Sequence, residues 1–228
     1  TAGTITSETK ANSFMSVVTH NGTGALGSIG HGIGKAPELI ISKDRLQGSR
    51  SWSVSANVGN VVFGSSYLLL NTTNAAIAYA HAVLSTTDSV MNLGIGSESN
   101  DLYYAGSSGS YVHYCFTSVE GLCKVGSYTG TGVAWTVEET VGFEIGWILI
   151  KRTDGLGSWY IKDFLRNDFD NTIVADVSTA EFVDNNLMTI TSTGFKHDAV
   201  GLEVNASGGT YIYLAIAKNT PEDLRIKE

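Results

Sequence analysis

The sequence predicts an all-β protein made of β-sandwich units, of the jelly-roll or lectin-like kind, arranged as two tandem pseudo-repeats. Three observations support this fold class. Apolar and β-branched runs of four to eight residues alternate with Gly, Ser and Asn clusters. Only 16% of the residues are charged, against roughly 25% in an average globular protein. Finally, several motifs recur in the same order along the chain.

The recurrence is clearest around two apolar runs that end in lysine. "NGTG" at 21–24 matches "TGTG" at 129–132, and "ELIISK" at 38–43 lies over "GWILIK" at 146–151, at the same offset of 108. Trp52 follows the first run and Trp159 the second. Five later residues recur at an offset of 100, namely Gly94, Leu102, Ser107, Gly109 and Tyr111 as Gly194, Leu202, Ser207, Gly209 and Tyr211.

These matches divide the chain into repeats. The predicted boundaries are an N-terminal extension at 1–12, sandwich repeats at 13–120 and 121–219, and a charged tail at 220–228. The offset falls by 8 because the first copy carries a longer segment around "NAAIAYAHAVLSTT". Only a tight turn at Glu120 and Gly121 joins the copies, so we expect them to pack as one body.

Each copy contains a series of expected strands. Those of the first copy are "FMSVVTH" (14–20), "ELIISK" (38–43), "WSVSA" (52–56), "YLLLN" (67–71), "SVMNLG" (89–94) and "YVHYCFTSV" (111–119). Those of the second are "KVGSYTG" (124–130), "WILIKRT" (147–153), "SWYIKDF" (158–164), "TIVADV" (172–177), "LMTITSTG" (187–194), "GLEVN" (201–205) and "TYIYLAIAK" (210–218).

At most one or two short helices are predicted. The alanine-rich segment 74–84 has Thr72 or Thr73 available as an N-cap. A smaller helical turn is expected around "STAEF" at 178–182, the aligned place in the second copy.

Charge and hydropathy exclude two classes of partner. The net charge of −8 has the wrong sign for a surface that binds phosphate backbones, so no nucleic-acid partner is expected. The longest apolar runs, such as "YLLL" and "WILI", are far shorter than the roughly 20 residues needed to cross a bilayer, so no membrane insertion is expected. The chain lacks an initiator Met, which suggests processing or a longer parent polypeptide.

The chain has two cysteines, Cys115 and Cys123, too few for a disulfide framework in a chain of 228 residues. Two free thiols are the favoured interpretation. A bridge between adjacent strands of one hairpin stays open as the alternative.

Gly22, Gly24 and Gly27 match the G-x-G-x-x-G pattern of dinucleotide-binding loops, and Asp44 follows at a suitable distance. Such a loop needs a helix that begins at the glycines, so that its amides meet the pyrophosphate. The next residues, "SIGHGIGKAP", cannot form one. The second copy, "GTGVAW", also loses the third glycine. We therefore interpret these residues as turn glycines.

No catalytic, cofactor-binding or metal-ligating residue is predicted, and no cofactor. "GSSGS" at 106–110 aligns with "ASGGT" at 206–210 and reads as a turn, not a nucleophile elbow. The histidines share no metal-ligand spacing; they are His20, His31, His81, His113 and His197. Asp163, Asp168 and Asp170 suggest a calcium loop but lack the glycine and distal glutamate of an EF-hand, so a solvated loop is favoured.

Aromatic residues leave a sugar-binding alternative open. Tyr103, Tyr104, Trp135 and Trp159 are able to stack on sugar rings, although sandwich aromatics more often fill the core. A glycan-degrading enzyme would need two carboxylates about 5 to 10 Å apart in a cleft, a spacing that sequence does not reveal.

Several repeated elements resemble structural proteins of marine tailed bacteriophages, cyanophages especially. The elements are "GSYTGTG", "HGIGKAPELIISK", "YLLLNTTNAA", "LIKRTDGLGSW" and "VNASGGTYIYLAIAKN", and the resemblance spans about residues 14–219. The first copy departs from the pattern, with "AGSSGSYVHYCF" in place of the fuller "NASGGTY" form. In that family such units occur in tail-fibre-like or virion-surface proteins.

The resemblance implies a non-enzymatic virion protein, either a capsid decoration or a tail-fibre module, exposed on the particle surface. Its partners would be other virion subunits and further copies of itself. The alternative is a carbohydrate-binding module that attaches to host-surface glycans; a glycan-degrading enzyme is less favoured. Outward loops are expected at Gly106–Gly109 and Ala206–Gly209, without being a defined site.

Overall fold

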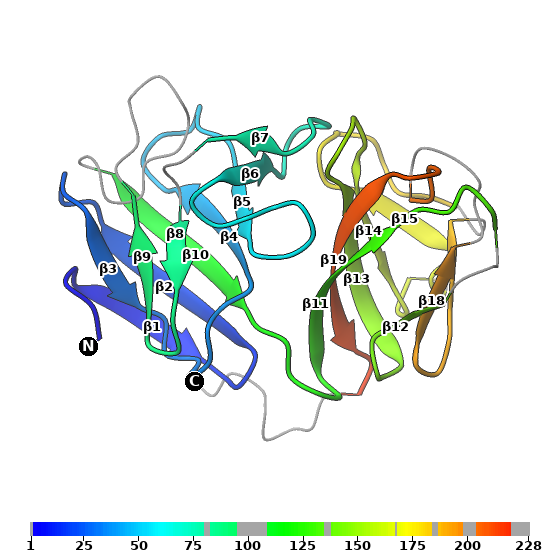
Figure 1. The fold of residues 1–228 in the computed structure, drawn as a ribbon, viewed down its shortest axis with the longest axis horizontal. Coiled ribbons are helices and arrows are strands. Elements are labelled where there is room, and N and C mark those ends of the chain that lie inside the picture. The colour runs from blue at the N-terminus through cyan, green and yellow to red at the C-terminus, as the bar shows by residue number, and fades with distance from the viewer. Residues whose placement is uncertain are drawn as a thin grey trace.

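The computed structural model describes residues 2–79, 83–94, 109–134, 138–166, 168–183, 187–197 and 204–219. All regular secondary-structure elements in these ranges are β-strands, so the predicted all-β class is confirmed. Figure 1 shows two sandwich units side by side, the first built from β1 to β10 and the second from β11 to β19.

The first unit pairs a large antiparallel sheet with a small one. The large sheet has the order β1 (Ser7–Ala11), β2 (Met15–Asn21), β10 (Ser110–Phe116), β4 (Leu39–Asp44), β5 (Ser53–Ala56), β6 (Ser66–Leu69), β7 (Ile77–Ala78). The small sheet has the order β3 (Gly27–Gly30), β9 (Val90–Leu93), β8 (Val83–Thr86). Ile29, Ile40 and Met91 are fully buried in the core between them.

The second unit repeats this plan. Its large sheet has the order β11 (Cys123–Thr129), β19 (Thr210–Ala217), β13 (Ile145–Arg152), β14 (Trp159–Asp163), β15 (Asn171–Val174), β16 (Phe182–Val183). Its small sheet has the order β12 (Glu138–Thr140), β18 (Gly194–His197), β17 (Met188–Ile190). Ile148, Ile150 and Phe195 lie in the core between these two sheets.

Strand order and register agree between the units. Taken in chain order, β2 to β10 occupy the same places as β11 to β19. Tyr111 lies opposite His20 and Asp44, while Tyr211 lies opposite Tyr128 and Arg152, at the sequence offsets of 100 and 108. The match of Gly94 with Gly194 in the sequence is an exception, because Gly94 follows β9 whereas Gly194 begins β18.

Residues 1–12 were expected to extend from the first repeat, but part of this segment belongs to its large sheet. β1 pairs with β2 from Ser7 opposite His20 to Ala11 opposite Ser16. Its sequence, "SETKA", is mostly polar and only Ser7 is buried, so the sequence lacks the apolar pattern that predicts a strand. The second unit has no counterpart of β1 among the described residues.

Neither predicted helix is present in the described residues. In the segment 74–84, Ile77–Ala78 forms β7 and Val83 begins β8; 80–82 lie outside the described residues. In 178–182, Phe182 begins β16. Alanine favours helix by only a fraction of a kcal/mol per residue (about 0.5 relative to β-formers), so pairing of Ile77 with Tyr67 outweighs it. The expected strand at 201–205 also fails where it is described, because Val204 and Asn205 lie in a turn.

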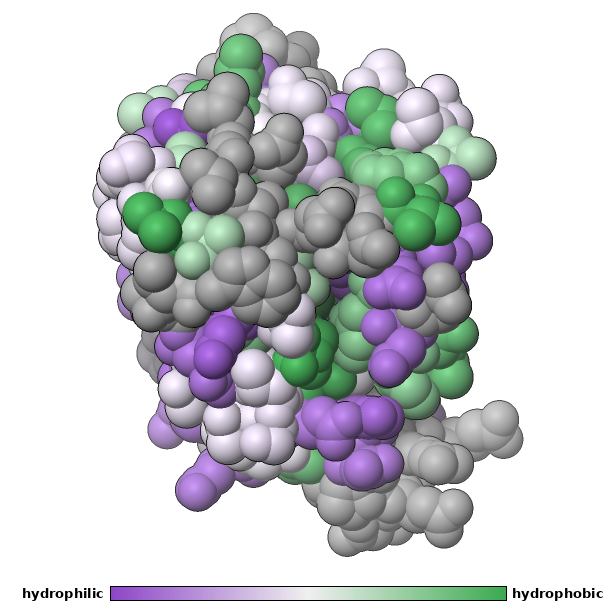
Figure 2. Space-filling model, turned by 90° about the vertical axis from the view of Figure 1, so that its right-hand side faces the viewer, coloured by the Kyte–Doolittle hydropathy of each residue, from purple (hydrophilic) through white to green (hydrophobic). Residues whose placement is uncertain are grey.

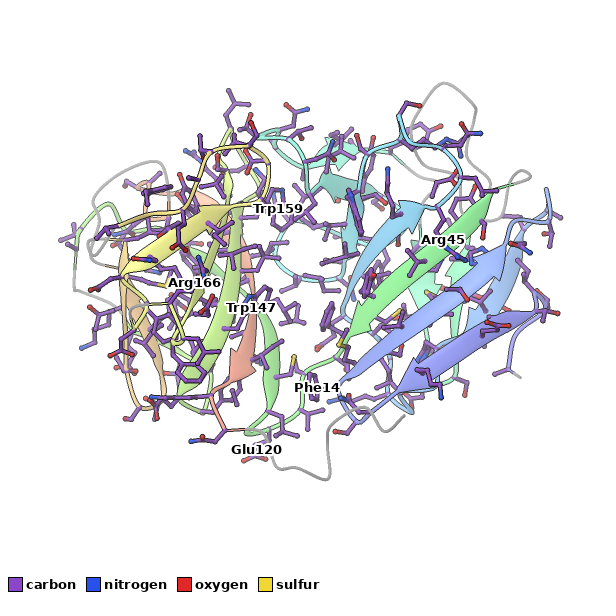
Figure 3. All side chains as sticks on the ribbon, turned by 180° about the vertical axis from the view of Figure 1, so that it is seen from behind. Phe14, Arg45, Glu120, Trp147, Trp159 and Arg166 are labelled. Carbon is purple, nitrogen blue, oxygen red and sulfur yellow. The ribbon has the colours of Figure 1, made fainter. Side chains whose placement is uncertain are left out.

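The large sheets of the two units pack against each other through their outer faces. One buried cluster spans the contact: Phe14, Leu39, Val54, Ala56, Val61, Leu68 and Phe116 of the first unit with Cys123, Val125, Leu149, Trp159, Ile212 and Leu214 of the second. Figure 3 shows Phe14, Trp147 and Trp159 where the units face each other. The two sandwiches are therefore one body with a third core between them.

Hydrogen bonds reinforce this contact. The indole N–H of Trp159 donates to the Leu69 carbonyl at 2.8 Å, and the Ala76 N–H donates to the Thr153 carbonyl at 2.8 Å. The Lys151 ammonium, fully buried, donates to the carbonyls of Thr73 and Gly157 at 3.2 and 2.6 Å. Burial lowers the pKa of Lys151 to about 8.

Both cysteines are free and buried, in different places. Cys115 lies in the core of the first unit and Cys123 in the cluster between the units. Burial raises the pKa of each thiol to about 12, so neither is a reactive thiolate at neutral pH.

We predict that Trp159→Ala lowers the free energy of unfolding by about 3–5 kcal/mol, because it leaves a cavity in the core between the units. Trp52→Ala is the matched control, since Trp52 holds the corresponding place in the first unit but is only half-buried. Urea denaturation followed by circular dichroism measures both. Equal losses in the two variants would contradict the importance assigned to this contact.

Candidate functional site

Gly22 and Gly24 lie in the turn between β2 and β3, as predicted, whereas Gly27 does not. Gly24 has a φ of 76°, which favours glycine, and Gly27 begins a strand, not a helix. A Cβ on Gly27 would lie 2.5 Å from the Ile5 side chain. These glycines serve the turn and close packing, and the geometry required for a dinucleotide is absent from this segment.

A hollow of about 430 Å³ lies at the end of the first unit, beside this turn. Polar side chains from several strands line it, including Ser7, Glu8, Thr19, His20 and Arg45. Of these side chains, that of His20 points inward, because the alternation of side chains along β2 turns it toward the core of the sandwich.

Behind the hollow, three polar side chains form a hydrogen-bonded row. His113 Nε2 and His20 Nδ1 are 3.2 Å apart, and His113 Nδ1 and Ser42 Oγ are 2.8 Å apart. The His20 ring also stacks on Tyr111, with centroids 5.2 Å apart. Burial, helped by the neighbouring His20, holds the pKa of His113 well below its usual range, so His113 is uncharged at neutral pH.

This row joins strands of the large sheet, and only His20 reaches the hollow. Ser42 and His113 are 1% and 0% exposed, so the serine hydroxyl is not placed as a nucleophile. The spacing of the five histidines along the chain does not reveal this row. The alternation in "FMSVVTH" and "YVHYCF" puts His20 and His113 on inward faces, but only strand register brings them together.

The second unit has aromatic residues at the corresponding positions. Tyr128 replaces His20 and Tyr213 replaces His113, while Ile150 replaces Ser42. Tyr128 stacks on Tyr211 with centroids 4.8 Å apart and donates its hydroxyl proton to the Val204 carbonyl at 2.8 Å. The same backbone therefore encloses two chemically different interiors.

His197 lies against this aromatic group. Its ring centroid is 4.3 Å from that of Tyr128, and the residue is buried. Neither ring nitrogen has a hydrogen-bond partner among the residues that the structure describes. Burial lowers the pKa of His197 to about 4. His31, by contrast, is hydrogen-bonded through Nε2 to the Thr87 carbonyl at 2.9 Å.

A second hollow, of about 510 Å³, lies in the second unit near the predicted acidic loop. Asp168 and Asp170 line it, together with Glu144, which pairs with Lys218 at 2.7 Å. Asp163 is paired instead with Arg166 at 2.7 Å. Within the described ranges, no group of three or more His, Cys, Asp or Glu side chains is arranged to hold a metal ion.

The predicted outward loops are only partly described. Gly109 is buried under Tyr111, and residues 106–108 lie outside the described residues. In the loop 206–209, Ser207 and Gly208 are exposed while Ala206 and Gly209 are buried. The loop is fastened by backbone bonds of 2.8 Å between Gly130 and both Gly208 and Gly209.

The aromatic residues named as sugar-binding candidates do not form an exposed platform in the described part of the chain. Trp159 is buried between the units, and Tyr103, Tyr104 and Trp135 lie outside the described residues. Trp52 and Tyr114, which the sequence analysis did not select, are half-buried and stack with centroids 6.4 Å apart.

Exposed apolar side chains concentrate in the second unit. Of the ten large hydrophobic side chains exposed among the described residues, five lie between residues 165 and 183: Leu165, Ile173, Val177, Phe182 and Val183. On the outer side of this unit, apolar and hydrophilic side chains are interspersed (Figure 2). The described residues include no helix that is long and apolar enough to span a membrane.

We predict that the free energy of unfolding falls as the pH drops from about 6.5 to about 4. Between these values His197 binds a proton in the unfolded chain, where its pKa is about 6.5, but not in the folded protein, where its pKa is about 4. His197→Leu should reduce this fall. It should also raise the free energy of unfolding at pH 7 by about 1 kcal/mol, since it removes a buried polar ring that has no hydrogen-bond partner in the described part of the chain.

His31→Leu is the contrasting control for this prediction. This substitution removes the hydrogen bond between the His31 ring and the Thr87 carbonyl, and the one that the ring accepts from the Ile33 N–H. The free energy of unfolding at pH 7 should therefore decrease. Thermal melts of the three proteins between pH 4 and 7.5 measure both effects. A pH profile unchanged by His197→Leu would refute the role of that residue.

Comparison with known proteins identifies a family. The model of the family described as "Domain of unknown function (DUF7483)" matches residues 1–220, so the chain belongs to that family. No curated protein matches the chain. A solved structure described as "Crystal Structure of the STIV MCP" is similar over 93% of this chain and 95% of that one, at 10% identity and a TM-score of 0.28. A similarity this low supports no argument about fold or function.

Proposed function

We propose that this member of the DUF7483 family is a non-enzymatic structural protein of a phage virion, a surface decoration or tail-fibre module that acts through contacts with other subunits. The sequence resemblance to virion proteins of marine tailed phages supports this proposal. Exposed apolar side chains on the second unit support an assembly role independently of that resemblance.

The observation that carries the proposal is an apolar surface on a tightly joined body. The two units share a buried cluster, so the protein presents its surfaces in one defined arrangement. Leu165, Ile173 and Val183 are nevertheless 81%, 38% and 67% exposed on the second unit. Exposed apolar side chains gathered in one segment of an otherwise well-packed protein suit a contact with another macromolecule.

We further infer that the chain arose by duplication of one sandwich. Both units have the same strand order and the same register around Tyr111 and Tyr211. Duplicated units that keep a backbone while changing their surfaces suit a repetitive assembly, because each unit makes a different contact.

Carbohydrate binding is the second candidate, because Trp52 and Tyr114 form a half-buried aromatic pair on an outer sheet face. In this function the pair would contact a sugar ring of a host-surface glycan. A glycan array with Trp52→Ala as control tests it, and binding that survives the substitution would rule out this pair as the site.

The location of the protein tests the main proposal. We expect mass spectrometry of purified particles to detect the protein in many copies, and antibody labelling in the electron microscope to place it on the outside of the head or tail. Absence from purified particles, with the protein present in the lysate of the same infected cells, would refute the proposed function.

A further inference from the structure

The hollow of about 430 Å³ in the first unit lies where two strands separate. The ladder between β1 and β2 ends with Ser7 opposite His20. Two residues earlier in the chain, the Ile5 N–H instead donates to the Ser28 carbonyl of β3, at 2.9 Å. The hollow opens beside this separation and the turn at Gly22. Its volume lies within the roughly 300–1,000 Å³ that is usual for small-molecule sites.

Two opposite charges line the hollow, and neither has an ion-pair partner among the described residues. Glu8 lies on β1 opposite Thr19, and Arg45 directly follows β4. Both side chains are exposed, and Figure 3 shows Arg45 on the first unit, away from the contact between the units. Within the described ranges, the Arg45 guanidinium makes one hydrogen bond, to Ser110 Oγ at 3.4 Å. Both charged groups therefore keep most of their hydrogen-bonding capacity for a ligand.

Most of the remaining lining is neutral and able to form hydrogen bonds. Its hydroxyl and amide side chains are those of Thr6, Ser7, Thr19, Asn21, Thr23 and Ser110. His20 adds a ring that is 4% exposed and is held in place by His113 and by stacking on Tyr111. Small-molecule sites are more often lined by apolar side chains, so this hollow suits a ligand that is bound mainly by hydrogen bonds.

The second unit lacks these features at the corresponding place, so the fold itself does not require them. Thr153 replaces Arg45, and its N–H donates to the Thr210 carbonyl just as the Arg45 N–H donates to the Ser110 carbonyl. Tyr128 replaces His20. Among the described residues, no strand of the second unit corresponds to β1, so Glu8 has no counterpart there.

Protein fills the same place in the second unit. Gly130 corresponds to Gly22, and a Cβ on Gly130 would lie 2.2 Å from the Ala206 carbonyl oxygen. The Tyr128 hydroxyl donates to the Val204 carbonyl of the same segment at 2.8 Å. One end of the sandwich is therefore hollow and charged in the first unit, but closely packed in the second.

We infer that the hollow in the first unit binds a neutral sugar residue. The charges of Glu8 and Arg45 balance, so a ligand with a net charge would be attracted by one and repelled by the other. A guanidinium only donates hydrogen bonds and a carboxylate only accepts them, whereas a hydroxyl group does both. Neighbouring hydroxyls of a sugar ring therefore accept from Arg45 and donate to Glu8, and further hydroxyls match the neutral side chains of the lining.

The hollow is separate from the aromatic pair considered above for carbohydrate binding, because neither Trp52 nor Tyr114 lines it. A free amino acid would also match the two charges, but it would leave the hydroxyl and amide groups of the lining unused. The use of this site in attachment to a host rests on the proposed virion role. The binding of a sugar does not.

Saturation-transfer NMR of the purified chain tests the site, with glucose, galactose, mannose and N-acetylglucosamine as probes. We expect at least one of them to bind in the millimolar range. Glu8→Ala and Arg45→Ala should each raise the dissociation constant by about 10-fold or more, because each removes hydrogen bonds to a charged group. Lys10→Ala is the matched control, an exposed residue of β1 that does not line the hollow, and should bind like the parent chain. Circular dichroism checks that each variant is folded.

Three results would overturn the inference. The parent chain binds none of the four sugars; or Glu8→Ala and Arg45→Ala bind as the parent does; or glycine or glucuronate binds more tightly than every neutral sugar. Binding that is lost only in Trp52→Ala would place the sugar at the aromatic pair instead. These failures are distinct from failure of the proposed function. A chain found in purified particles that binds no sugar would refute this site alone, and a chain that binds sugar in the hollow but is absent from particles would refute the virion role alone.

Discussion

The structure depends on one contact, the burial of the outer faces of the two large sheets around Trp159. Each large sheet covers its inner face with a three-stranded sheet, and its outer face also carries apolar residues that require a cover. A single sandwich would expose that outer face to water. Packing the two units against each other covers residues of both outer faces: those at the centre, such as Trp159, are fully buried, and those around it, such as Tyr114 and Ile216, are partly buried.

The two units show how far an interior can change while its backbone stays the same. In the first, His113 links His20 and Ser42 in a hydrogen-bonded row; in the second, tyrosine and isoleucine fill the same positions. Both solutions satisfy the same requirement, since buried polar groups need hydrogen-bond partners and apolar groups need contact. His197 departs from this pattern, because its ring nitrogens have no hydrogen-bond partner within the described ranges.

The internal contact uses apolar residues of both outer sheet faces. Tyr114 of the first unit and Trp147, Ile161 and Ile216 of the second pack, partly buried, against the cluster between the units. Ile173 is 38% exposed and is not part of that cluster.

Local patterns in the sequence were sufficient for the strand-rich fold class and for the turn at Gly24, because alternation and glycine spacing are read from neighbouring residues. They failed where distant pairing outweighed local preference. The alanine-rich segment became strand through its pairing with Tyr67, and the polar residues Ser7–Ala11 became an edge strand through pairing with β2.

The sequence by itself determined that the chain forms β-strands, that its motifs recur in order, and that its glycines serve turns. Only the tertiary structure decided which histidines meet, which tryptophan is buried, and which apolar residues stay uncovered. The physical reason is that these properties depend on strand register and on the packing of one sheet against another, which join residues far apart in the chain.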